Sequence, residues 1–178
     1  MKMPRGAAGA LMIMAAAAVQ AQTFDLSSGP YSVNVDKTTS ALFTDTYNFS
    51  FTGLSGIISG SIMEYRLSKA IDIDWADSAA VAIHGGWDGS GALLASFAER
   101  CAQTSGFAIE DVAVPNHFSI TISGRATGTG ASLFQPGLRG SYDFSVAAQP
   151  VSEPQTWALS MAGLLVVGFL GLRRRGRS

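Results

Sequence analysis

The chain has 178 residues, of which 47% are hydrophobic and 14% are charged, and its formal net charge is −1 at pH 7. Half of its cationic side chains lie in the first five and the last six residues, so residues 22–150 carry six cationic against twelve acidic side chains. Such an acidic body lacks the basic footprint that nucleic-acid binding requires, and no nucleic-acid partner is predicted.

The N-terminus has the pattern of a secretory signal peptide. Lys2 and Arg5 precede a small and apolar run over residues 6–19, and the small residues Val19 and Ala21 indicate cleavage after Ala21. The run is too short for a permanent membrane span. Residues 1–21 are therefore predicted to direct export and to be removed.

Alternation of apolar and polar side chains, typical of strands with one buried face, recurs through the body. It is clearest at residues 31–36, 43–51, 71–75, 117–125 and 141–146. Further candidates are 57–67, 79–84 and 93–100, the last of which could also be a short helical turn. Breaks rich in Gly and Ser, such as residues 52–56 and 84–91, separate these segments. The pattern predicts one all-β domain over residues 22–148, an antiparallel β-sandwich of jelly-roll-like kind.

Asp45 is unusual because alternation places it on the same strand face as Phe43 and Tyr47. A carboxylate in such surroundings must be paired or hydrogen-bonded, since its unpaired burial is costly. The structural interpretation is a set of hydrogen bonds from backbone N–H groups of a turn or from Arg139. The alternative is a calcium ligand, although Ca²⁺ takes six or more oxygens.

Asp72, Asp74 and Asp77 are the candidate metal ligands of the body. They supply three hard oxygen donors that could converge beside a loop rich in carbonyl groups. Their spacing lacks the twelve-residue pattern of a calcium loop, so a solvated acidic face is the preferred interpretation. No metal or cofactor is predicted.

Trp75 and Trp87 raise the question of sugar binding, because exposed indoles stack on sugar rings. Trp75 alternates with Ile71 and Ile73 and is predicted to lie in the core, whereas Trp87 lies in a Gly-rich loop beside Asp88. The motifs of serine hydrolases, zinc proteases and P-loop proteins do not occur. The sequence therefore predicts a protein that is not an enzyme.

The C-terminal segment combines a short motif, an apolar run and a basic end. Residues 157–172 carry no charge, and as a helix they cover roughly 24 Å, which is short for a bilayer core of about 30 Å. Four arginines follow, namely Arg173, Arg174, Arg175 and Arg177. Because arginines stay on the cytoplasmic side, the pattern predicts a transmembrane helix at 157–172 with residues 173–178 inside and the body outside the inner membrane.

This order of features resembles the PEP-CTERM sorting signal of Gram-negative bacteria. The family motif usually reads Pro-Glu-Pro, and Ser152, Glu153 and Pro154 keep its Glu-Pro pair within residues 149–156. The resemblance implies recognition by an exosortase, a membrane-embedded cysteine transpeptidase-like enzyme that cuts near Glu153 and Pro154.

The body carries a second resemblance. Phe43, Asp45 and Tyr47 at alternate positions are similar to the opening strand of the FxDxF subgroup of PEP-CTERM proteins. Those ectodomains close on a Gly-x-Tyr-x-Phe-x-Val-like strand before the tail, which corresponds to residues 140–146. The resemblance implies an exported β-rich protein and no particular chemistry.

Together these features predict a non-enzymatic protein of the cell envelope or extracellular matrix, processed by an exosortase and linked to exopolysaccharide or biofilm. The expected partners are the exosortase, the inner membrane before processing, and exopolysaccharide. Two alternatives stay open. One is a carbohydrate-binding or adhesive module delivered to the surface, and the other is a plain membrane-anchored periplasmic protein.

Overall fold

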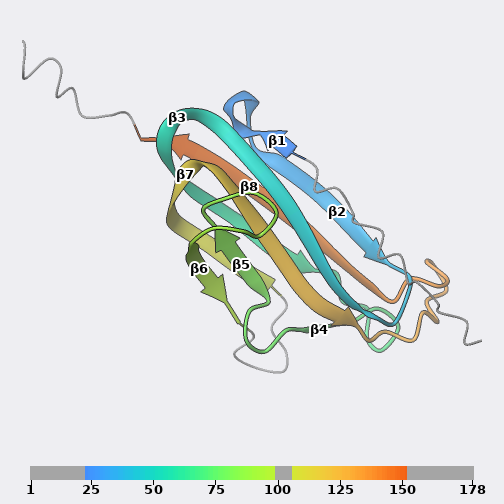
Figure 1. The fold of residues 1–178 in the computed structure, drawn as a ribbon. Coiled ribbons are helices and arrows are strands. Elements are labelled where there is room, and N and C mark those ends of the chain that lie inside the picture. The colour runs from blue at the N-terminus through green and yellow to red at the C-terminus, as the bar shows by residue number, and fades with distance from the viewer. Residues whose placement is uncertain (1–22, 99–105, 152–178) are drawn as a thin grey trace, which may run out of the picture.

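The computed structural model describes residues 23–98 and 106–151, and this part of the chain is all-β (Figure 1). Its strands are β1 (Thr23–Asp25), β2 (Tyr31–Lys37), β3 (Leu42–Glu64), β4 (Ile73–Trp75), β5 (Val81–His84), β6 (Leu93–Phe97), β7 (Gly106–Ala126) and β8 (Gly140–Pro150). One turn of 3-10 helix, η1 (Leu26–Ser28), links β1 to β2. Within the described ranges, no helix has the length and hydrophobicity to cross a membrane.

The two long strands, β3 and β7, pair with each other along almost their whole length and bend together. The first half of β3 pairs with the second half of β7, from Leu42 opposite Arg125 to Ser50 opposite His117. The second half pairs from Ser55 opposite Pro115 to Met63 opposite Gly106, after a register shift between Ser50 and Ser55. Figure 1 shows β3 curving over at one end of the domain, so that its two halves lie in different layers.

The bend divides the sheet into two facing layers, consistent with a β-sandwich. Layer A has the order β1, first half of β3, second half of β7, β5, β6, with β4 also paired to β7. Layer B has the order β2, β8, second half of β3, first half of β7. All of these pairs are antiparallel except β1 with β3.

The core lies between the layers and is made by the alternating positions that the sequence indicated. Ring centroids of Phe49 in layer A and Phe144 in layer B are 6.0 Å apart, and Tyr31 on β2 lies 5.5 Å from Phe49. The completely buried large side chains include Phe49, Phe118, Ile120, Ile122, Tyr142 and Phe144. The prediction of an all-β antiparallel domain is confirmed.

Two details of the predicted strand pattern were wrong. Residues 52–56 were expected to separate two strands, but β3 continues through them, because Gly53 at φ +126° and Gly56 allow a sharp bend. A Cβ on Gly56 would lie 2.7 Å from the Phe51 ring. The first half of β7 was not predicted, because the register shift opposite Ile58 and Gly60 interrupts its alternation.

Candidate functional site

Phe43, Asp45 and Tyr47, the residues of the opening motif, meet the closing strand across the sandwich. The Tyr142 hydroxyl on β8 donates a short hydrogen bond to Asp45 Oδ2, and the hydroxyls of Tyr47 and Tyr142 lie 3.2 Å apart. The Phe43 ring stacks on the Tyr142 ring with centroids 6.0 Å apart. The two motifs, separated by about a hundred residues, therefore form one contact between layers A and B.

Lys37, at the end of β2, supplies the counter-charge. Its Nζ lies 2.7 Å from both Asp45 oxygens and 4.5 Å from the centroid of the Phe43 ring. Asp45 is thus paired, as the structural interpretation required, but the expected donors were wrong. Arg139 instead donates to the Gly128 carbonyl at 2.9 Å.

Burial sets the ionisation of this cluster. It raises the pKa of Tyr142 far above its ordinary value and raises the pKa of Tyr47 to about 12, with the Asp45 charge adding to both shifts. A tyrosine with a raised pKa stays protonated and keeps donating at neutral pH. The cluster is therefore a clamp between layers, with no ionised tyrosine available for chemistry.

The three candidate metal ligands do not converge. Asp72 Oδ1 accepts from Arg66 Nε at 2.6 Å and its Oδ2 accepts from Thr127 Oγ1 at 3.1 Å, so both oxygens are occupied. Asp74 and Asp77 are exposed. Across residues 23–98 and 106–151, no three His, Cys, Asp or Glu side chains are placed to hold a metal ion.

Trp75 and Trp87 have different environments. Trp75 is buried, and its Nε1 donates to Glu64 Oε2 at 3.3 Å, as a core position requires. Trp87 lies in the loop between β5 and β6 and is 37% exposed, with its ring centroid 4.7 Å from that of His117. The second indole is therefore accessible on the surface.

Hydrogen bonds hold the loop that carries Trp87 against the outer face of layer A. Asn48 and Asp88 exchange two hydrogen bonds of 2.8 Å, and Gly89 N–H donates to Ser119 Oγ at 3.0 Å. Asp88 and Gly89 have φ values of +55° and +70°, which Asx and Gly residues tolerate best. These bonds bury Asn48 and Ser119 and fix the position of Trp87.

A polar row leads across layer A to Trp87. Asp25 pairs in register with Ser50, and Ser50 with His117, so the three side chains share the outer face on neighbouring strands about 4.8 Å apart. Asp25 Oδ1 accepts from Ser27 N–H at 2.9 Å, and this bond lowers the pKa of Asp25. The row offers an ionised carboxylate, a hydroxyl and an imidazole beside an indole.

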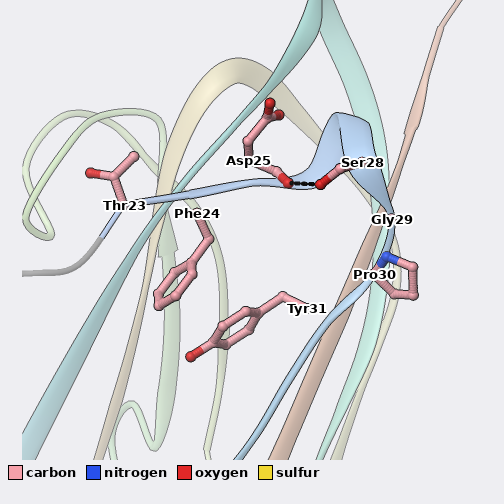
Figure 2. A pocket seen from close by; sticks show the side chains of 7 residues that line it. All are labelled: Thr23, Phe24, Asp25, Ser28, Gly29, Pro30 and Tyr31. Atoms are coloured by element: carbon pink, nitrogen blue, oxygen red, sulfur yellow. Dashed lines mark hydrogen bonds between the residues drawn. The ribbon is translucent and has the colours of Figure 1, made fainter.

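An open pocket adjoins the Asp25 end of this row, where the chain passes from layer A to layer B (Figure 2). The rings of Phe24 and Tyr31 lie together on one side of β1, with centroids 4.0 Å apart, and the side chains of Thr23 and Asp25 point to the other side. The pocket is lined by Thr23, Phe24, Asp25, Ser28, Gly29, Pro30 and Tyr31.

No protein-family model, curated protein or solved structure matches the chain. Several predicted sites lie outside the described residues and stay predictions. They are the signal cleavage site at Ala21, the motif Ser152, Glu153 and Pro154, the helix at 157–172, and Arg173, Arg174, Arg175 and Arg177.

Sequence reasoning missed the residues that surround the Trp87 loop. Asn48, which bonds Asp88, and His117, which contacts the Trp87 ring, occupy the polar side of predicted strands, where alternation indicates solvent, and so does Ser50. Only the Gly-rich composition of residues 85–91, which permits positive φ angles, hinted that the loop folds back.

Proposed function

We propose that the chain is an exported, non-enzymatic protein of the cell envelope or extracellular matrix, released from the inner membrane by exosortase processing near Glu153 and Pro154. The observation that carries the proposal is where the last described strand ends. β8 ends at Pro150, and Val151 N–H donates the last described backbone bond to the Ser55 carbonyl at 3.2 Å. A cut near Glu153 would therefore leave every described strand intact.

The same proposal assigns the body to a jelly-roll sandwich. If the short strands β1 and β4 are left out and β3 and β7 are each divided at the bend, the chain forms eight segments, numbered 1 to 8 from the N-terminus. In this numbering, layer B has the order 1, 8, 3, 6 and layer A has the order 2, 7, 4, 5. This is the order of two interlocked Greek keys, with β1 and β4 as additions. Jelly rolls serve many functions, so the fold is compatible with a non-enzymatic envelope or matrix protein but does not identify a ligand.

Mass spectrometry of the protein from its native host tests the processing. The expected mature form ends near Glu153, lacks residues 157–178 and is found outside the inner membrane. Pro154→Ala accumulates the longer form in that membrane, whereas the matched Pro150→Ala variant is processed normally. An unaltered protein that keeps Arg177 and stays in the inner membrane of a host with an exosortase would show that the tail is only an anchor.

A second candidate function is carbohydrate binding on the outer face of layer A. It is favoured by the half-exposed indole of Trp87 at the end of the row Asp25, Ser50 and His117. The indole would stack on a sugar ring. The carboxylate would accept hydrogen bonds from the sugar hydroxyl groups, and the serine hydroxyl would donate a hydrogen bond to one of them.

A glycan array distinguishes a carbohydrate-binding domain from an exported domain that binds no sugar. Binding to a polysaccharide should be lost in Trp87→Ala and weakened in Asp25→Asn, while Leu94→Ala, which changes an exposed side chain on β6, retains it. Absence of binding by the unaltered protein, or equal binding by Trp87→Ala, would rule out this site.

A further inference from the structure

The most exposed large hydrophobic side chains of the described residues are neighbours in one loop. Leu133 and Phe134, between β7 and β8, are 93% and 90% exposed. Single exposed apolar residues are common on protein surfaces, whereas contiguous exposed apolar surface is typical of interaction sites.

This exposure is a property of an ordered turn. Ser132 is buried, and its Oγ accepts from the N–H groups of Phe134 and Gln135 at 3.3 Å. Gly137 N–H donates to the Gly130 carbonyl at 2.9 Å and closes the base of the loop. The turn therefore holds the two apolar side chains outward.

A neighbouring loop supports this turn. Thr129 N–H donates to the Lys69 carbonyl at 2.9 Å, and Gly130 N–H donates to the Ala70 carbonyl at 3.0 Å. Residues 66–72 and 125–139 thus form one end of the domain, called here the cationic tip.

The charge of the cationic tip is opposite to that of the rest of the domain. It contains four cationic residues and one acidic residue, Asp72, whereas the other described residues include one cationic and ten acidic residues. Asp72 neutralises Arg66 at a distance of 2.6 Å. The other cationic side chains are Lys69, which is exposed, Arg125, which lies opposite Asp74 of β4 in the register, and Arg139, which is partly buried and donates to the Gly128 carbonyl.

We propose that the cationic tip docks on an anionic lipid surface, with Leu133 and Phe134 entering the headgroup and acyl boundary and the cations contacting lipid phosphates. Interfacial binding of this kind scales with the buried apolar area and with attraction to anionic lipids, and the tip provides both. An acidic polysaccharide would satisfy the cations but would offer no hydrocarbon layer for Leu133.

The tip lies at the end of the sandwich opposite to the point where the described chain leaves it. Val151 is bonded to Ser55 at the bend of β3, whereas β8 begins and β7 ends at the tip. Docking by the tip therefore does not require the C-terminal segment, and the proposal is independent of its processing.

A fluorophore placed on the tip tests the proposal locally. In the full-length chain, Cys101→Ser removes the single cysteine of the sequence, and Phe134→Cys supplies a new thiol for an environment-sensitive dye. The protein is held in nanodiscs of zwitterionic lipid. Vesicles containing phosphatidylglycerol should shift the dye emission to the blue, and vesicles of phosphatidylcholine alone should not. A dye at Leu93→Cys, an exposed position on β6, should not respond to either.

Charge reversal completes the experiment. Lys69→Glu with Arg125→Glu should raise the anionic vesicle concentration for half-maximal shift at least about tenfold, since each cation near such a surface contributes appreciably. Circular dichroism confirms that this variant is folded. The proposal is wrong if the dye at position 134 does not respond, if it responds equally to zwitterionic vesicles, or if an acidic polysaccharide produces the same shift.

Discussion

At the residue scale, Asp45 illustrates how a carboxylate is kept between aromatic rings. It accepts from Lys37 and Tyr142 at once, and both donors come from layer B. The residue that looked anomalous in the alternation thus ties the two layers together at the end where β2 ends and β8 begins.

Asp45→Ala is expected to lower the free energy of unfolding by about 1–3 kcal/mol, because it leaves a part-buried Lys37 and the Tyr142 hydroxyl without their acceptor. Asp36→Ala removes an exposed acid from β2, the strand that carries Lys37, and should change the stability by less than about 0.5 kcal/mol. Urea denaturation of both variants provides the measurement. Equal effects would mean that the cluster does not clamp the layers.

The same cluster predicts a loss of stability at alkaline pH. The native pKa of Tyr47 is raised to about 12 and that of Tyr142 is also raised, whereas unfolded tyrosines ionise near pH 10. The unfolded state therefore loses protons first, so this contribution is complete below about pH 10 and is lost as the pH rises toward about 12.

Denaturant midpoints measured across this pH window test the prediction. Tyr47→Phe should make the decline shallower, and Tyr65→Phe, which changes an exposed tyrosine, should leave it unchanged. If the unaltered protein and the two variants lose stability equally as the pH rises, the loss does not originate in the raised pKa of Tyr47.

At the element scale, the close approach of β3 and β8 depends on glycine. A Cβ on Gly60 would lie 2.3 Å from the Ser145 carbonyl oxygen, so the two strands cannot keep their spacing around a larger residue. Gly85, where an added Cβ would have its nearest contact at 3.6 Å, offers a matched position with room.

Gly60→Ala is therefore expected to destabilise the domain by about 1–3 kcal/mol, and Gly85→Ala by less than about 0.5 kcal/mol. Thermal denaturation followed by circular dichroism compares the two. If Gly60→Ala is neutral, β8 does not pack against β3 as closely as the register of the two strands requires.

At the scale of the whole molecule, the described strands contain a complete aromatic core. The core rings of Phe49, Phe118, Tyr142 and Phe144 all lie within the described strands. Residues 23–151 expressed alone should therefore give a β-rich circular dichroism spectrum and a cooperative unfolding transition.

Phe49→Ala in that fragment should cost about 3–5 kcal/mol, because its completely buried ring contacts both layers. A helical spectrum, or a fragment that unfolds without cooperativity, would contradict the assignment of the core.

The sequence by itself determined the class of the fold, the strand faces and the inward position of Asp45. These follow from alternation, which is a local property, because successive side chains of a strand point to opposite faces. The targeting segments were equally local predictions, and they lie outside the described residues.

Only the tertiary structure decided how the strands pair, that β3 bends instead of stopping at residues 52–56, and which groups Asp45 meets. The same holds for the row that joins Asp25 to His117 and for the pairing of the two loops in the cationic tip. Each of these joins residues far apart in the chain, and their contacts depend on register and on the closure of the two layers, which one strand's composition does not encode.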